Sequence, residues 1–511
     1  MKRYIYYISA VLILAISGCK KDFGDLNKNP NSLSTPTPAF LFSKSLLSTM
    51  SNSYYLTGVL NLGGFIQHYA TYKEVSGIGD KYFANDFYQA PYFTDGYPTA
   101  VNEIEEVIRA VKATPAEVNK LNVARIWRVY IYHRMTDLYG DVPYSEAGKG
   151  LTGLNFTPKY DAQETIYKDM LKELDEAAAG LDAAKASYGG NDFIYGGDAG
   201  KWKKFAYSLM LRLGLRLTKK DAALSETWVK KAIAGGVILN KEDNAIMRYS
   251  DGPQDLNRNP TARESRSRDF SANSFGKNNI EGGKLSTTFI NYLKNNNDPR
   301  LSVYSGVWVG TTQDPNPAIQ KGFPNGTGTA PSANDLGTYS EPNQNTVLRL
   351  DAPLLVLGNA ETNLYLAEAA ARGWNNVGSA GQFYVKGVTG SFDNAAMYGS
   401  AYAISSDKIN QYLTAHPFDV AGTFDKQMEQ IHTQIWAALY IDEYEVFANW
   451  RRTGYPVLIP VNYPGNVTGG TIPRRLIYPN AEGASNAKNI QDAISRQGAN
   501  TLTTRVWWDK Q

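Results

Sequence analysis

The chain contains 511 residues, and its 52 basic and 49 acidic side chains leave a net charge of only +3. This balance gives no support for nucleic acid or a strongly anionic surface as a partner. The single cysteine cannot close a disulfide within the chain, so burial has to hold the fold together. A single hydrophobic core stops growing near ~250–300 residues, which predicts two lobes or a layered array of helices.

The first residues have the layout of an export signal. Lys2 and Arg3 precede an apolar run over residues 4–16, and two small residues then lead into Cys19. The run is too short to cross a bilayer, which needs about 20 apolar residues. Because the only thiol directly follows the small residues, the segment resembles a bacterial lipobox. It predicts that residues 1–18 are a signal peptide and that Cys19 carries lipid; the alternative is an ordinary signal peptide with an unrelated cysteine.

Polar residues and prolines over 19–38 predict a tether between the lipid and a body that spans 39–511. Apolar residues then recur at helical spacing. The helices predicted in the first scaffold section, 39–239, span 41–50, 98–113, 116–139, 162–181, 200–218 and 227–234. The first four after 41–50 form two successive pairs, which indicates a tetratricopeptide-like array of antiparallel helices.

The sequence changes character over residues 240–350, which are rich in Asn, Gly, Pro and Asp. This composition predicts a loop-rich insertion with a few short strands. Helices resume in a second scaffold section, 351–455, at 353–373, 405–413 and 425–452. The last segment, 456–511, is predicted to be irregular. The predicted fold is therefore mostly α: a tetratricopeptide-like helical-pair scaffold with long irregular loop insertions and a few short strands.

Several short segments follow one another in a distinctive order. They are DLYGDVPYSEA (137–147), WKKFAYSLMLRLGLR (202–216), NLYLAEAAARG (363–373), QIWAAL (434–439), NWRRTGYP (449–456) and IPRRLIYP (472–479). In this order, behind a lipobox, they resemble the SusD/RagB-like nutrient-binding outer-membrane lipoproteins of Bacteroidetes. The resemblance implies four tetratricopeptide-like helical pairs, exposure at the cell surface, and a role as a lid over a SusC-type TonB-dependent transporter. It also implies an oligosaccharide ligand, or in some members a peptide.

Signs of catalysis are weak. The four histidines share no metal-type spacing, and the sequence has no G-x-S-x-G elbow and no phosphate-binding glycine loop. Asp442, Glu443 and Glu445 are the nearest approach to the two carboxylates of a glycosidase, but a solvated helix face is the simpler interpretation. The chain is therefore predicted not to be an enzyme. A surface adhesin or scaffold is an alternative function, and a glycoside hydrolase is a weaker one.

Two stretches begin like a calcium-binding loop, one at Asp25 and one at Asp255. In both, proline replaces the glycine that the sixth position needs, and the twelfth position is Pro36 or Arg266 rather than glutamate. Asx-turns explain these stretches better. No cofactor is predicted, and calcium stays an unsupported alternative.

Sugar binding favours exposed aromatic rings next to polar side chains, and the chain has 34 tyrosines. Two loop regions, 69–97 and 240–350, offer this combination. The candidate ligand-binding residues are Tyr72, Tyr82, Asp86, Phe87 and Tyr92 in the first region and Arg266, Trp308 and Tyr339 in the second. We expect aromatic rings from both regions to converge on one shallow site; the alternative is that they pack the loops.

Overall fold

The computed structural model describes residues 37–51, 53–74, 77–270, 275, 277 and 282–510. The predicted signal peptide, Cys19 and nearly all of the predicted tether lie outside these residues. Helices make up 53% of the structure and strands 6%, which confirms a mostly α fold. Among the described helices, none combines the length and the apolar character needed to span a membrane.

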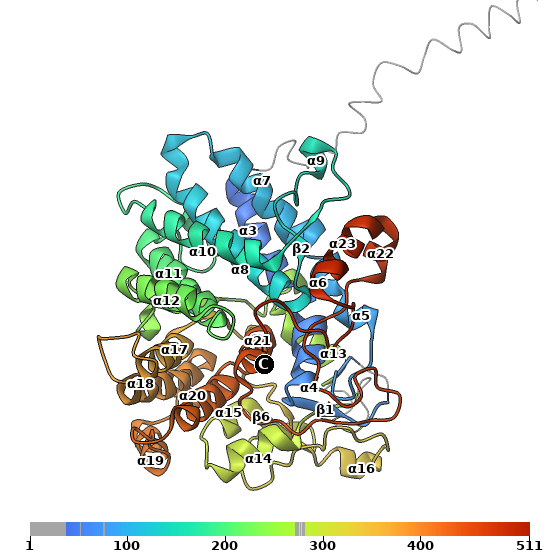
Figure 1. Ribbon diagram of the computed structural model, residues 1–511. Helices are drawn as coiled ribbons and strands as arrows, with labels where there is room; N and C mark the ends of the chain where they lie inside the picture. Colours follow the sequence, from blue (N-terminus) through green and yellow to red (C-terminus); the bar gives the residue numbers. More distant parts are fainter. Residues whose placement is uncertain are drawn as a thin grey trace, which may run out of the picture.

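Long helices stack into one array along the left side of Figure 1. The array contains α3 (Pro38–Thr49), α7 (Asn102–Val111), α8 (Val118–Tyr139), α10 (Gln163–Ala179), α11 (Ala199–Arg216), α12 (Ala222–Gly235), α17 (Asn359–Ala371), α18 (Ala380–Asp393), α19 (Ser406–Ala415) and α20 (Phe424–Ala438). One further helix, α21 (Glu443–Thr453), lies between this array and the loop-rich side of the molecule.

The loop-rich side is built from short elements. Its helices include α4 (Gly63–Phe65), α5 (Asp86–Gln89), α6 (Pro91–Thr94), α13 (Pro260–Ser267), α14 (Thr287–Asn295), α15 (Leu301–Tyr304), α16 (Ala333–Leu336), α22 (Asn480–Ser485) and α23 (Ala487–Gln497). The strands are β1 (Tyr69–Thr71), β2 (Val142–Pro143), β3 (Tyr160–Asp161), β4 (Ala245–Met247), β5 (Gly283–Leu285), β6 (Ser305–Val309), β7 (Thr312–Asp314), β8 (Glu341–Pro342) and β9 (Leu354–Leu357). They form antiparallel sheets with the orders β1-β5, β2-β3, β4-β9 and β7-β6-β8.

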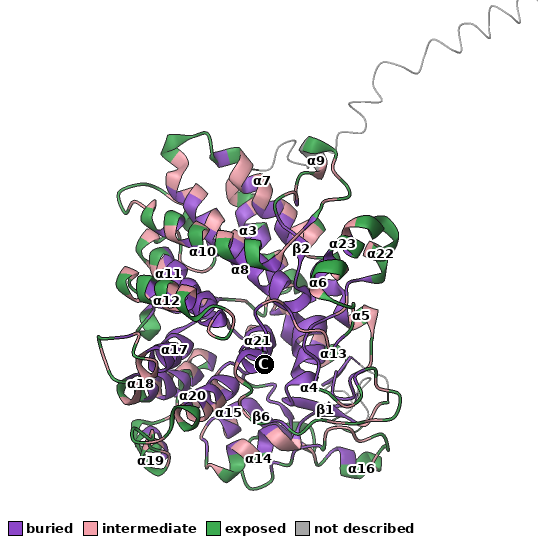
Figure 2. Ribbon diagram, in the orientation of Figure 1, coloured by how far each residue is buried: buried purple, intermediate pink, exposed green. Residues whose placement is uncertain are grey.

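The predicted helical pairs contact one another: α7 packs on α8, and α10 packs on α11. α8 is buried along most of its length because α7, α10, α11 and α21 all contact it. Figure 2 shows buried residues concentrated around α8, α17 and α21, while the outer faces of α10 and α12 are exposed. The main hydrophobic cluster continues from the array into the loop-rich side, so the helices hold the loops in place.

In the second scaffold section, 351–455, three elements differ from the sequence-based expectation. The helix predicted over 425–452 is two helices, α20 and α21, separated by a turn in which Ile441 has a left-handed φ of 85°. The start of the helix predicted at 353–373 is strand β9, because its backbone pairs with β4. α18 was not expected because its glycines weaken the helix signal. Gly387 lets α18 approach α17, since a Cβ there would lie 2.6 Å from Leu364 Cγ.

Candidate functional site

The two loop regions predicted to carry ligand-binding aromatics lie side by side. β1 from the first region pairs antiparallel with β5 from the second, with Tyr69 opposite Leu285 and Thr71 opposite Gly283. Backbone hydrogen bonds therefore fix the relative position of two segments that are far apart in the sequence. In Figure 1, β1, which precedes Tyr72, and α16, which precedes Tyr339, both lie at the lower right of the molecule.

Tyr72 and Tyr339 meet on a small apolar cluster of Ala70, Phe323 and Leu336. Tyr72 directly follows β1, and Tyr339 lies just before β8. Both rings are half-buried, so each keeps part of its surface open. The Tyr339 ring meets Phe323 edge-on with centroids 4.8 Å apart, and a nearby lysine ammonium lies 4.1 Å from its centroid. These two predicted residues are therefore brought together.

Trp308, on β6, is also half-buried. Its indole Nε1–H donates a 3.0 Å hydrogen bond to Glu341 Oε2, and the other oxygen of Glu341 accepts from Lys284 Nζ at 2.5 Å. Phe275 meets the Trp308 ring edge-on at 5.8 Å. Since Glu341 and Lys284 are both fully buried and paired, they hold the indole in one orientation.

Two of the predicted ligand-binding aromatics, Tyr82 and Tyr92, were expected to be exposed, but the structure buries both. Tyr82 is fully buried, its hydroxyl oxygen accepts from the backbone N–H of Val461, and burial raises its pKa to about 12. Tyr92 is 4% exposed and packs against Tyr444 of α21 at 4.8 Å. Loops of this size need large apolar side chains to attach them to the core, and these two tyrosines have that role.

The other three predicted residues lie apart from this surface. Asp86 begins α5, and its Oδ1 accepts from the backbone N–H of Asn480 at 3.1 Å, which ties α5 to the C-terminal segment. Phe87 is 60% exposed and contacts its neighbour Tyr88. Arg266 is half-buried on α13, where burial lowers its pKa. In the same region, Asn259 caps α13 through the backbone N–H of Ala262, so the second calcium-like stretch ends in a helix cap.

A groove of about 510 Å³ opens between two loops, 324–326 and 459–464, and we call it the 459–464 groove. Gln67, Thr287 and Thr288 also line it. Gln67 Nε2 donates to the backbone carbonyl of Ile459, and Thr288 donates to Gln67 Oε1 at 2.8 Å. The other wall is fixed by Asn325, whose Nδ2 donates to the carbonyl of Tyr69 at 2.8 Å. The groove is thus attached to the β1 strand on one side and to α14 on the other.

Tyr463 stands on the wall of this groove and was missed from the sequence. Its half-buried ring meets Phe83 edge-on at 6.0 Å, and the ring also contacts Gly328. A Cβ at Gly328 would lie 2.7 Å from Tyr463 Cε2, so only glycine leaves room for the ring. The signal available in the sequence is an aromatic residue between two prolines, Pro460 and Pro464, in a segment dismissed as irregular.

The charged side chains near the groove are paired. Lys81 Nζ lies 5.6 Å from the Tyr463 centroid, donates to the carbonyl of Thr71 at 2.6 Å and pairs with Asp80 at 3.2 Å. Burial raises the pKa of Asp80, while Lys81 acts against that shift. Asp80 also accepts from the backbone N–H of Gly326 at 3.0 Å. The groove therefore presents aromatic, amide and hydroxyl groups, with its neighbouring charges compensated.

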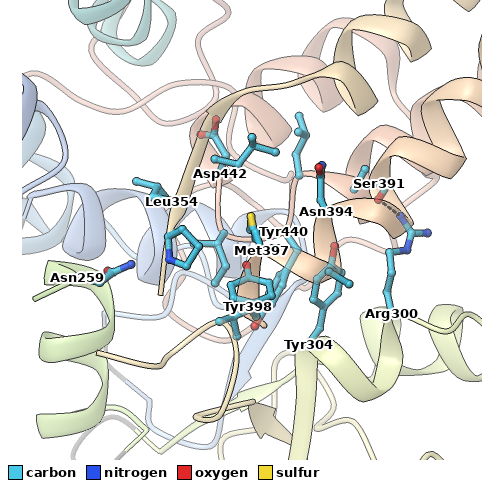
Figure 3. A pocket seen from close by; sticks show the side chains of 17 residues that line it. Asn259, Arg300, Tyr304, Leu354, Ser391, Asn394, Met397, Tyr398, Tyr440 and Asp442 are labelled. Atoms are coloured by element: carbon cyan, nitrogen blue, oxygen red, sulfur yellow. Dashed lines mark hydrogen bonds between the residues drawn. The ribbon is translucent and has the colours of Figure 1, made fainter. Parts of the chain in front are cut away.

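The acidic residues at the start of α21 are buried rather than solvated, so the expected solvated helix face is wrong. Asp442 accepts from Arg134 at 2.9 Å, Glu443 pairs with His68 at 2.7 Å, and Glu445 accepts from Arg216 at 2.6 Å. Asp442 lies beside a small cavity of about 40 Å³, shown in Figure 3. That volume holds a few water molecules but no sugar ring.

Comparisons with known proteins agree with these features. The family described as SusD-like, "Starch-binding associating with outer membrane", matches residues 30–479. A solved chitin-binding protein is 33% identical with a TM-score of 0.81, covering 93% of this chain and 100% of that chain. A SusD homologue from Bacteroides uniformis is 25% identical (TM-score 0.78, coverage 93% and 100%). A chitin-binding SusD homologue from Flavobacterium johnsoniae is also 25% identical (TM-score 0.75, coverage 93% and 97%). No curated protein matches the chain.

The match spans most of the chain and confirms the resemblance drawn from the ordered motifs. The carboxylates of α21, which were the best candidates for a catalytic pair, are all engaged in buried ion pairs. The chain therefore belongs to the SusD-like family of non-catalytic, glycan-binding surface proteins that associate with the outer membrane.

Proposed function

We propose that this chain is a cell-surface lipoprotein that binds an oligosaccharide and delivers it to a SusC-type TonB-dependent transporter. The observation that supports this best is the 459–464 groove, with Tyr463 on its wall and with the half-buried rings of Tyr72, Tyr339 and Trp308 on elements of the loop-rich side. Sugar rings have an apolar face and a rim of hydroxyl groups. A groove that combines aromatic rings with amides and hydroxyls suits both parts of such a ligand.

Within that class, we infer that the ligand is a chitin oligosaccharide. The 33% identical relative and the F. johnsoniae homologue are both described as chitin-binding. Chitin is uncharged, which suits a groove whose neighbouring charges are already paired. Asn462, an exposed residue on the groove wall, offers a side-chain amide to the acetamido groups of such a chain.

Membrane attachment in this proposal depends on Cys19. The lipobox-like segment before it supplies the acylation site, and more than one lipid chain is needed for stable anchoring. The first described helix is α3 at Pro38–Thr49, and the proposal assigns residues 19–38 to the tether. The outer-membrane association of the family supports this location.

The test is isothermal calorimetry of the chain from residue 20 onward against N-acetylglucosamine oligosaccharides, other glycans and peptides, with product analysis on the same samples. We expect saturable binding of the N-acetylglucosamine series without turnover. Replacing Tyr463 or Tyr339 by alanine should weaken it about tenfold each, since each change removes a ring contact worth about 1–1.5 kcal/mol. Phe156→Ala is the matched control, because this 74% exposed aromatic lies against Gly150 of α9 (Gly150–Gly153), which is at the top of Figure 1, away from β1.

Each other outcome contradicts a defined part of the proposal. Turnover of a glycan would contradict the binding role and indicate that the chain is a glycoside hydrolase. Binding of peptides alone would place the chain among peptide-binding members of the family. Failure of every ligand to bind would support an adhesin or scaffold instead.

A further inference from the structure

A second, larger cavity lies at the opposite end of α14 from the 459–464 groove. Its volume is about 900 Å³, and it is enclosed by the C-terminal end of α14, by α15, by the proline-containing loop 315–318 and by α19. In Figure 1, α19 lies at the lower left and α14 and α15 lie at the bottom centre. Cavities of this size accommodate small-molecule ligands. We call it the α14–α19 cavity.

The floor of the α14–α19 cavity is apolar and its rim is polar. Leu301, Val303 and Tyr412 are at most 4% exposed and form part of the floor. Two exposed prolines, Pro315 and Pro317, add ring faces to one wall. This part of the lining supplies the apolar contact that one face of a sugar ring requires.

Three side chains on the rim have polar atoms available to a ligand. They are Tyr402, which is half-buried beside the start of α19, and Lys408 and Gln411, which are exposed on α19 itself. Within the part of the chain that the structure describes, none of these three side chains makes a side-chain hydrogen bond or ion pair. The rim therefore offers one aromatic ring, one amide and one ammonium group to a ligand.

The shape of the α14–α19 cavity is held by buried and bridging contacts. Lys294 Nζ, on α14, donates to the carbonyls of Ala318 and Gln320 and so ties the proline-containing wall to the helix. Asp298 lines the cavity but is paired with the buried Arg300 at 2.6 Å, which compensates its charge. The lining is preorganised without a free buried charge, a state that suits a neutral ligand.

We propose that the α14–α19 cavity is a second saccharide-binding site. It stacks a sugar ring on Tyr402 and hydrogen-bonds its hydroxyls through Gln411 and Lys408. Thr287 and Thr288, at one end of α14, line the 459–464 groove, and Lys294, near its other end, lines this cavity. At 1.5 Å per residue these lining residues are about 10 Å apart along the helix axis, a spacing that a glycan of several sugar rings can span. Holding a polymer at two sites raises its affinity without strengthening either contact.

The inference takes its ligand class from the proposed function, so the test treats the two sites separately. The double variant Tyr402→Ala/Gln411→Ala is compared with Tyr463→Ala and with the control Phe156→Ala. All four of these positions are exposed or half-buried, so the variants should stay folded. The probes are an N-acetylglucosamine trisaccharide and hexasaccharide, measured by calorimetry, and insoluble chitin, measured by sedimentation.

We expect the Tyr402→Ala/Gln411→Ala variant to bind the trisaccharide with one site fewer than the unmodified chain. It should also retain chitin about tenfold more weakly, because one of two linked contacts is lost. Tyr463→Ala should leave the Tyr402 site titratable. A single site in the unmodified chain, lost in Tyr463→Ala and unchanged in Tyr402→Ala/Gln411→Ala, would overturn the second site alone. Absence of binding to every probe would overturn the chitin assignment and the second site together.

Discussion

At the scale of single residues, the ordered motifs that identify the family turn out to be largely structural. Glu368 of the NLYLAEAAARG segment is fully buried and accepts two hydrogen bonds from Arg452 of the NWRRTGYP segment, both at 2.7 Å. His432 Nε2 lies 3.2 Å from the same carboxylate. This buried cluster joins α17, α20 and α21, so these residues hold the scaffold together rather than contact ligand.

Replacing Glu368 by glutamine should destabilise the protein at pH 7 by about 3–5 kcal/mol, because it leaves the buried guanidinium of Arg452 without a counter-charge. Chemical denaturation measures the loss. Burial raises the pKa of Glu368, but Arg452, with His432 and Arg372, outweighs burial and holds that pKa well below its ordinary value.

A carboxylate with a lowered pKa stabilises the fold above its unfolded-state pKa and loses that contribution as the pH falls toward its folded-state pKa. The difference between Glu368→Gln and the unmodified chain should therefore shrink below about pH 4.5. A constant difference across pH would contradict this account. Asp492→Asn, in an exposed ion pair with Lys488, serves as control and should change little.

Gly328 is a position at which a single added methyl group should change ligand binding. Replacing it by alanine places a methyl group against Tyr463 and should displace that ring from the groove wall. We expect glycan affinity to fall about tenfold while the melting temperature changes little, since the loop is near the surface. Gly190→Ala is the matched control, because no atom lies within 4 Å of its added Cβ. Unchanged affinity in Gly328→Ala would remove Tyr463 from the site.

The candidate site could be predicted only in part. The regions 69–97 and 240–350 could be chosen because their aromatic residues stand out in loop-like sequence, and Tyr72, Trp308 and Tyr339 do keep part of their surface open. Burial of Tyr82 could not be predicted, because it depends on Val461, which is remote in the sequence. Tyr463 was missed for the same reason, since its neighbours Phe83 and Gly328 are also remote in the sequence.

At the scale of elements, the periodicity of apolar residues predicted the bounds of a helix well where that helix buries one face. α10 and α11 lie within two residues of their predicted ends because apolar side chains repeat at helical spacing along both. The break between α20 and α21 carries no such signal, since buried and mostly apolar residues continue through it. The C-terminal segment was predicted to be irregular but contains α22 and α23, whose short lengths give little pattern to detect.

The segment that follows α23 is anchored to the helical core by Trp508. Trp508 is fully buried and donates from Nε1 to Asp137 Oδ1 of α8 at 2.8 Å, and Arg451 of α21 lies 4.8 Å from its ring centroid. Trp508→Ala should cost about 3–5 kcal/mol in unfolding free energy, measured by denaturant titration, because it opens a cavity and leaves Asp137 without one of its donors. The half-buried neighbour Trp507 is the control, and its replacement by alanine should cost clearly less. Equal losses would mean that the tail is held by other contacts.

At the scale of the whole molecule, anchoring and binding are assigned to separate parts of the chain. Cys19→Ser should move the protein from the membrane fraction to the soluble fraction of cells, as measured by fractionation and immunoblotting. Its affinity for glycan should stay the same, since the groove and its supports lie within residues 67–464. Retention of Cys19→Ser in the outer membrane would contradict lipid anchoring at this residue.

The antiparallel pairing of β1 with β5 also sets the order in which the protein can fold. Two strands so distant in sequence close a long loop when they pair. The entropic cost of closing that loop must be met before the pairing stabilises the fold. The helices from α7 to α12 involve nearer neighbours and can assemble as soon as they are available. The 459–464 wall comes last in chain order. The groove can therefore be completed only after residues 459–464 have been made, and the scaffold itself also needs later contacts, such as that of Trp508 with Asp137.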